Sequence, residues 1–329
     1  MKILSTCFSR SFPVWTLPEW AADEVRRRFP EVQVVRLTSP ESILREIADA
    51  DCLFATVVKD AHIHAARRLK WIHTPSAGLE WILTPALVAS DVTVTNSKGA
   101  LAIPVAEHAL ALMLALSRRL HHCFDDQRRG VSRREDLLRS TPSFEELSGK
   151  TVGVIGLGSI GTQIARLCGA FGMRVVGFRR NPDGKPEFVE RIYPPSMLDA
   201  ELPSLDYVVV AAPLTIETRG MLGKNQFERM KPTAYLINVA RGEIIDQDAL
   251  ADAVETERIA GAGLDVTQPD PLPDGHPLHS AKNILITPHV SGLSPMLWRR
   301  LVDLWIENIQ RFLEGRELIN TVTDKTRGY

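Results

Sequence analysis

Residues 152–161 read Val-Gly-Val-Ile-Gly-Leu-Gly-Ser-Ile-Gly, and this stretch decides the fold class. It begins as an apolar run typical of a buried strand and continues, after two glycines, into a helical pattern. A second apolar run ends at Phe178. The order strand, glycine turn, helix, strand is the unit that places the pyrophosphate of a dinucleotide at a helix N-terminus. The sequence therefore predicts a dinucleotide-binding domain built on a parallel sheet.

Each glycine of this turn has its own physical reason. Gly156 permits the tight turn, Gly158 lets the backbone approach the pyrophosphate, and Gly161 allows the helix to pack closely on the strand. The alternative is a tight strand–helix turn without a ligand, but the second strand that follows favours dinucleotide binding.

Two arginines, Arg179 and Arg180, follow the second strand. A carboxylate usually stands there and binds the ribose 2′-hydroxyl, whereas guanidinium groups would attract a 2′-phosphate. We therefore expect NADP(H) as the preferred cofactor and NAD(H) as the less favoured one. The alternative is that both arginines simply project into solvent.

Length and composition limit the classes of function. A chain of 329 residues favours two domains, and a formal net charge of -1 argues against nucleic-acid binding. The most apolar helical pattern, residues 103–116, contains Glu107 and His108 and is too short to span a bilayer. We expect no membrane partner.

The cysteines and histidines give no sign of a disulfide or metal site. Four cysteines are widely scattered, and His62 and His64 lack a third ligand nearby in the sequence. Reduced thiols and an N-terminus without a secretory pattern predict a cytoplasmic protein without a metal centre.

Short apolar runs alternate with helical patterns along the whole chain, which predicts two α/β domains with parallel sheets. The expected strands are residues 2–5, 32–37, 51–58, 71–74 and 92–95, then 152–155, 174–178, 207–211, 234–238, 263–266 and 284–287. We expect a doubly wound Rossmann domain of residues 100–293, inserted into a smaller flavodoxin-like substrate domain of residues 1–99 and 294–329. Residues 130–143 are expected to be irregular.

Three polar residues follow successive strands of the second series: Arg241, Asp270 and His289. Ligands bind at the carboxyl ends of the strands in such sheets. Arginine offers a planar fork for a carboxylate, and histidine can exchange a proton near neutral pH while a carboxylate orients its ring. These residue types suit hydride transfer to a 2-oxo acid. The alternatives are purely structural roles: a helix-cap donor for Arg241, a core histidine for His289 and a turn former for Asp270.

At these residues the chain resembles the D-isomer-specific 2-hydroxyacid dehydrogenase family. The matching motifs are Ser76-Ala-Gly-Leu, Val105-Ala-Glu-His-Ala-Leu, the glycine turn, Pro213-Leu-Thr-Ile-Glu-Thr218, Asn238-Val-Ala-Arg-Gly and Thr287-Pro-His. The resemblance implies that Arg241 binds and polarises the substrate, that His289 is the acid/base, and that Asp270 is its carboxylate partner. It also implies substrate-carboxylate binding at Ser76, Ala77 and Gly78. The implied cofactor contacts are Ser159, Ile160, Pro213, Thr218, Val239, Ala240 and Asp265.

One residue departs from the family pattern. The family most often has glutamate where this chain has Asp270, which is one methylene shorter. Either the loop lies closer to His289 or the coupling is weaker, and four prolines in that loop favour a fixed position.

The sequence as a whole predicts an NADP(H)-preferring reductase of small 2-oxo acids, with glyoxylate and hydroxypyruvate as the favoured substrates. The family commonly forms homodimers, so we expect one here. Two alternatives remain open. One is an NAD-preferring dehydrogenase of another D-2-hydroxy acid, and the other is a dinucleotide-sensing binding protein like the related transcriptional corepressors.

Overall fold

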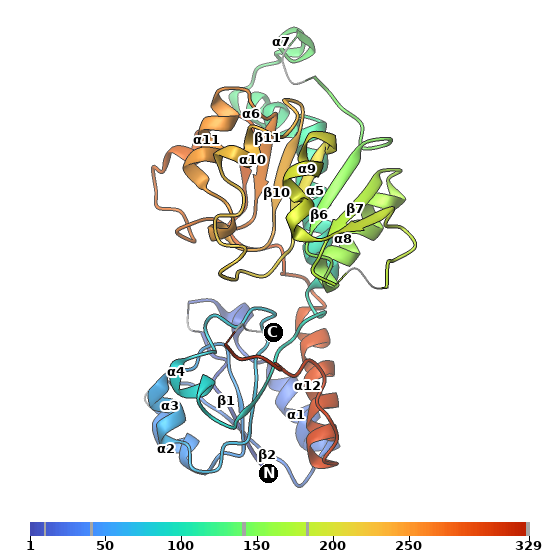
Figure 1. The fold of residues 1–329 in the computed structure, drawn as a ribbon. Helices are drawn as coiled ribbons and strands as arrows, with labels where there is room; N and C mark the ends of the chain where they lie inside the picture. The colour runs from blue at the N-terminus through green and yellow to red at the C-terminus, as the bar shows by residue number, and fades with distance from the viewer. Residues whose placement is uncertain (10, 40–41, 140–142, 182–183, 327–329) are drawn as a thin grey trace. The chain divides into compact units, whose positions relative to one another are not determined.

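The computed structural model describes residues 1–9, 11–39, 42–139, 143–181 and 184–326. The chain divides into two compact units, residues 1–101 with 294–329, and residues 102–293. Both are α/β units with an all-parallel sheet (Figure 1).

The first unit has a five-stranded sheet in the order β2-β1-β3-β4-β5, which is the flavodoxin-like order. Its strands are β1 (Lys2–Ser5), β2 (Gln33–Arg36), β3 (Cys52–Phe54), β4 (Trp71–His73) and β5 (Thr93–Thr95). Its helices are α1 (Glu19–Arg28), α2 (Ile43–Glu46), α3 (Asp60–Ala65), α4 (Pro85–Val88) and α12 (Leu297–Leu313). Helices α1 and α12 lie on one side of the sheet and α2 to α4 on the other (Figure 1).

Alternation along the strands produces these two faces. Ile3 and Trp71 belong to the apolar cluster under α1 and α12, whereas their neighbours Leu4 and Ile72 belong to the opposite cluster. Burial on both sides explains why the strands read as continuous apolar runs instead of alternating ones. The last helix seals the first face, because its Trp305 ring lies 4.4 Å from the ring of Phe54, centre to centre.

The second unit has a seven-stranded sheet in the order β12-β11-β10-β9-β6-β7-β8. Its strands are β6 (Thr151–Ile155), β7 (Arg174–Phe178), β8 (Arg191–Tyr193), β9 (Tyr207–Val210), β10 (Tyr235–Asn238), β11 (Gly261–Leu264) and β12 (Ile284–Ile286). Its helices are α5 (Ala102–Ser117), α6 (Leu120–Arg129), α7 (Arg134–Arg139), α8 (Ser159–Ala170), α9 (Leu198–Glu201), α10 (Lys224–Phe227) and α11 (Gln247–Glu255). The strand order reverses between β6 and β9, and such a switch point is where doubly wound sheets bind ligands.

The structure confirms the expected fold class. Several strands are shorter than expected, most of all β3, which spans Cys52–Phe54 where a strand over residues 51–58 was expected. Three further elements differ more clearly. The edge strand β8 was not expected, because it is three residues long and opens on a charged residue. Helix α7 lies inside the stretch expected to be irregular; its six residues, four of them charged, show no apolar periodicity. Strand β11 begins and ends two residues earlier than expected.

The shift of β11 follows from its small residues. A Cβ at Gly261 would lie 2.4 Å from the carbonyl oxygen of Asn283, and one at Gly263 would lie 3.0 Å from Leu112 of α5. Close packing on both sides therefore requires glycines, which mask the strand signal in the sequence.

Two further observations concern the surface. Within the described residues, no helix is both long enough and apolar enough to cross a membrane.

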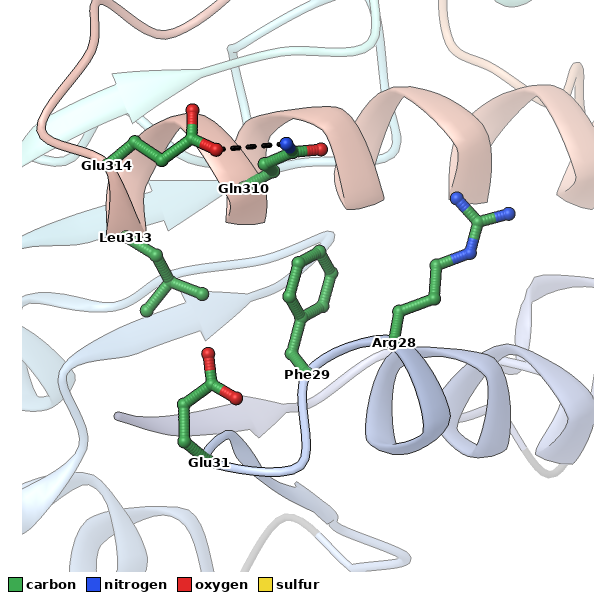
Figure 2. Close-up of a pocket in the computed structure, with 6 residues that line it drawn as sticks. All are labelled: Arg28, Phe29, Glu31, Gln310, Leu313 and Glu314. Carbon is green, nitrogen blue, oxygen red and sulfur yellow. Dashed lines mark hydrogen bonds between the residues drawn. The ribbon is translucent and has the colours of Figure 1, made fainter.

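A hollow in the first unit lies between the ends of α1 and α12 and is lined by Phe29, Glu31 and Leu313, among others (Figure 2). It adjoins the segment that enters β2, so it lies at the amino ends of the strands, away from the edge where ligands bind in such sheets.

Candidate active site

The glycine turn joins β6 to α8 at the switch point of the larger sheet. Gly156 has φ +91°, and a Cβ there would lie 2.7 Å from the backbone of Ala212. A Cβ at Gly161 would lie 1.8 Å from the carbonyl oxygen of Gly156, whereas one at Gly158 would meet nothing within 4 Å. The turn is therefore closed toward the sheet and open at the start of α8, where Ser159 and Ile160 carry the first helical amides. This arrangement fits a dinucleotide pyrophosphate.

Arg179 and Arg180 follow β7 on the same edge of the sheet. Arg179 is half-buried and Arg180 is exposed. The backbone amide of Arg179 donates to the carbonyl of Tyr193 at 3.0 Å, and the Tyr193 ring stacks on Phe178. Strand β8 thus holds the backbone from which both guanidinium groups extend.

The loop after β9 carries Pro213 and Thr218. The Thr218 hydroxyl donates to the carbonyl of Pro213 at 2.7 Å and accepts from the amide of Thr215 at 2.8 Å. Thr218 therefore closes its own loop, and this side-chain role was not visible in the sequence.

Arg241 follows β10 in a loop that Asn238 holds. The buried Asn238 side chain accepts from the amide of Ala240 at 3.0 Å and donates to the carbonyl of Arg241 at 2.9 Å. Val239 and Ala240 are buried. The half-buried Arg241 guanidinium donates to the carbonyl of Ala240 at 2.7 Å. The loop thereby holds the Arg241 backbone and one nitrogen of its guanidinium group.

Asp265, at the end of β11, is buried and anchors the segment after β12. Its Oδ1 accepts from the Thr287 hydroxyl at 2.6 Å and from the amide of Val290 at 3.0 Å, and its Oδ2 accepts from the amide of Ser291 at 3.0 Å. Its carbonyl accepts from the amide of His289 at 2.9 Å. Asp265 therefore has a structural function besides the cofactor contact that the resemblance implies.

His289 and Asp270 form a direct pair. The distance from His289 Nδ1 to Asp270 Oδ2 is 2.6 Å, and the side chains are 48% and 30% exposed. Because an ionised carboxylate only accepts hydrogen bonds, Nδ1 carries the donated proton and Nε2 is left to exchange one. Asp270 thus reaches the ring despite its shorter side chain.

The arginine, carboxylate and histidine therefore follow three adjacent strands, at one edge of one sheet. β10, β11 and β12 are neighbours, and Arg241, Asp270 and His289 come from the segments after their carboxyl ends. The glycine turn and the arginine pair follow β6 and β7 on the same edge.

Ser76, Ala77 and Gly78 belong to the first unit, in the loop after β4. Within the described part of the chain, the amide nitrogens of Ala77 and Gly78 have no hydrogen-bond partner. Two adjacent unpaired amides are the donors that a carboxylate would need.

Residues 110–291 match the family described as D-isomer specific 2-hydroxyacid dehydrogenase, NAD binding domain. The match covers more than half of the chain and includes the glycine turn, Arg241, Asp270 and His289. The chain belongs to the D-isomer-specific 2-hydroxyacid dehydrogenase family. It is therefore an oxidoreductase that uses a nicotinamide cofactor.

Individual relatives of this dehydrogenase carry more specific names. It is 34% identical over 303 residues to a glyoxylate reductase from Thermofilum pendens, covering 88% of this chain and 87% of that protein. It is 33% identical over 310 residues to a D-3-phosphoglycerate dehydrogenase from Archaeoglobus fulgidus, covering 93% of this chain but 58% of that protein. A solved D-isomer specific 2-hydroxyacid dehydrogenase from Xanthobacter autotrophicus Py2, in complex with NADPH and MES, is 26% identical, with a TM-score of 0.82 and 99% of each chain covered.

The structure of this dehydrogenase also shows a contact that sequence reasoning missed. His108 on α5 lies 2.8 Å from the Thr287 hydroxyl through its Nε2. Because Thr287 gives its only hydroxyl proton to Asp265, His108 Nε2 must be the donor. From the sequence, His108 is expected to be packed or to face a subunit contact. Its partner Thr287 lies 179 residues away in the sequence, so no local pattern indicated the bond.

Proposed function

We propose that this dehydrogenase reduces small 2-oxo acids with NADP(H), with glyoxylate or hydroxypyruvate as substrate. The observation that carries the proposal is the pair of His289 and Asp270, 2.6 Å apart, which come from the segments after β12 and β11. Arg241 follows the next strand of the sheet, β10. Besides holding the hydride donor, a protein that reduces a 2-oxo acid must transfer a proton and bind the substrate carboxylate.

The cofactor would be held along the carboxyl edge of the larger sheet. The open turn at Gly158 and the first amides of α8 would bind the pyrophosphate. Arg179 and Arg180 would bind the 2′-phosphate of NADP(H). The loops that carry Pro213, Thr218, Val239, Ala240 and Asp265 would line the rest. A bound nicotinamide supplies the hydride.

The residues of the chain supply the remaining chemistry. In reduction, His289 gives the Nε2 proton to the carbonyl oxygen of the substrate, and in oxidation it takes that proton back. Asp270 holds the ring orientation through Nδ1 and stabilises the protonated imidazole. Arg241 would bind the substrate carboxylate and polarise its carbonyl, with the amides of Ala77 and Gly78 as further donors for the carboxylate.

A panel of 2-oxo acids assayed with NADPH and with NADH tests this proposal. One good charge-assisted hydrogen bond to the 2′-phosphate gives a preference for NADPH of about ten- to a hundredfold in kcat/KM. Arg179→Asp should shift that preference toward NADH. Arg166→Asp on α8 is the matched control, because it makes the same charge change on an exposed arginine that donates to Gln163 of its own helix.

Two results would contradict the proposal. Equal or better kcat/KM with NADH would remove the cofactor preference and favour the NAD-dependent alternative. Tight NADPH binding without turnover of any 2-oxo acid would favour the dinucleotide-sensing alternative.

A further inference from the structure

The loop after β4 is held by residues 96 and 97, which follow β5. The amide of Ser97 donates to the carbonyl of Ser76 at 2.9 Å, and Asn96 Nδ2 donates to the carbonyl of Ala77 at 2.9 Å. The Ser97 hydroxyl donates to the carbonyl of Thr74 at 2.9 Å. Three carbonyls of one short loop are thus bonded to two consecutive residues.

These bonds also set the direction of the loop amides. In a trans peptide the C=O and the following N–H lie on opposite sides. The Ser76 carbonyl points toward Ser97, so the amide of Ala77 must point away from it. For the same reason, the bond between the Ala77 carbonyl and Asn96 turns the amide of Gly78 away. The two unpaired amides are therefore oriented by the bonds on the other side of their peptides.

A buried chain of side chains lies behind this loop. Trp71 Nε1 donates to Thr95 Oγ1 at 2.8 Å, Thr95 Oγ1 lies 2.7 Å from His73 Nδ1, and His73 Nε2 lies 3.2 Å from Ser97 Oγ. All four side chains have an exposed fraction of 0%. No charged group is among these partners.

Only one direction of hydrogen bonding satisfies every group in this chain. Ser97 donates its single hydroxyl proton to the Thr74 carbonyl, so Ser97 Oγ must accept from His73 Nε2–H. His73 Nδ1 then accepts the hydroxyl proton of Thr95, whose oxygen accepts from Trp71. This requires a neutral imidazole, and burial lowers the pKa of His73 to about 3.

The backbone beneath Asn96 is held separately. Asn320 donates through Nδ2 to the carbonyls of Asn96 and Lys98, at 3.2 and 2.9 Å, and the amide of Asn96 donates to the carbonyl of Asn320. A substitution of the Asn96 side chain removes the bond to Ala77 and also the one that Asn96 Oδ1 accepts from the amide of Lys98 at 3.2 Å. The bonds of Asn320 should still hold the backbone on both sides of this position.

We propose that Asn96, Ser97 and His73 are positioning residues that orient the amides of Ala77 and Gly78 toward the carboxylate of the substrate. The inference rests on the proposed function of this loop. Donors that are already oriented need no reorganisation when the anion binds, so their loss should weaken carboxylate binding more than it slows the chemical step.

The test uses the full-length protein and two variants, Asn96→Leu and Ser97→Ala. KM and kcat are measured with the best substrate of the panel, and the dissociation constant of oxamate, an unreactive 2-oxo acid analogue, is measured in the presence of NADPH. We expect KM and the oxamate constant to rise about five- to twentyfold, which corresponds to the loss of one hydrogen bond. We expect kcat to change less than about twofold and NADPH affinity to stay the same.

A control and a rescue separate positioning from general destabilisation. Ser90→Ala removes a similar bond, from the Ser90 hydroxyl to the Leu87 carbonyl at 2.8 Å, elsewhere in the same unit, and should leave KM unchanged. His73→Gln keeps an N–H near the place of Nε2 and should retain most of the affinity that His73→Leu loses.

Clear results would overturn the inference. The inference fails if KM and the oxamate dissociation constant are unchanged in both variants. It also fails if kcat falls while KM stays unchanged. If the parent protein reduces the 2-oxo acid and the variants bind oxamate as tightly as the parent does, the inference fails but the proposed function stands. A parent protein that neither binds oxamate nor reduces any 2-oxo acid overturns both.

Discussion

The pairing of His289 with Asp270 depends on the position of the loop that carries Asp270. The sequence left open whether the shorter carboxylate could reach the ring. In the structure, His289 Nδ1 and Asp270 Oδ2 are 2.6 Å apart. Two sets of hydrogen bonds hold the loop there: the Gln247 side chain bonds the amide and the carbonyl of Gln268, and the Thr267 hydroxyl donates to the carbonyl of Pro269. Loop placement compensates for the missing methylene.

This arrangement predicts the effect of Asp270→Asn. The amide can still accept a hydrogen bond but carries no charge to stabilise a protonated ring, so we expect kcat to fall about ten- to a hundredfold. His289→Ala, which removes the proton carrier, should cost about 10²–10⁴-fold. The exposed Asp274 lies in the same loop, and Asp274→Asn is the control in steady-state assays at one pH. Equal losses from Asp270→Asn and Asp274→Asn would argue against the pairing.

At the element scale, the glycine turn combines two requirements that a pair of variants can separate. Position 161 requires glycine because a Cβ there would lie 1.8 Å from the Gly156 carbonyl oxygen. The function of Gly161 is therefore to let α8 pack on the turn. Gly158 has open space around its Cβ position. Its function would be to leave room for the phosphates.

We therefore expect opposite results from two alanine substitutions. Gly161→Ala should lower the free energy of unfolding by about 1–3 kcal/mol through overpacking. Gly158→Ala should leave the Tm close to that of the parent and weaken NADPH binding. Thermal unfolding and NADPH titration of both variants check this. Unchanged NADPH affinity in Gly158→Ala would remove the turn from the binding site.

At the scale of the whole molecule, acid stability should report on the buried His73. Its pKa of about 3 in the folded protein lies below the value of about 6.5 in an unfolded chain. The unfolded chain therefore binds one more proton between these values, so the free energy of unfolding falls as the pH falls through this range, by up to about 1.4 kcal/mol per pH unit. Urea unfolding at pH 7 and pH 5 should show a smaller loss in His73→Gln than in the parent. An equal loss in both would contradict this.

The homodimer that the family resemblance implies is also a property of the whole molecule. Phe124 and Leu138 are 56% and 65% exposed on α6 and α7, and α7 stands away from the sheet of its unit (Figure 1). A second copy of the chain would bury these exposed apolar side chains. We propose that this region forms the dimer contact. Light scattering should find a dimer for the parent protein and a monomer for the double variant that carries Phe124→Asp and Leu138→Asp. A monomeric parent protein would contradict the proposal.

Sequence alone predicted the features that depend on local geometry. Glycine spacing, apolar runs and the residues after each strand predicted two parallel sheets, the dinucleotide turn and the three polar residues at one edge, because these signals span only a few positions each. The tertiary structure alone decided which distant groups meet. The bond between His108 and Thr287, the reach of Asp270 to His289 and the chain from Trp71 to the loop at Ala77 join residues up to 179 positions apart. Such contacts depend on how strands and helices pack, and no pattern within a single segment encodes that packing.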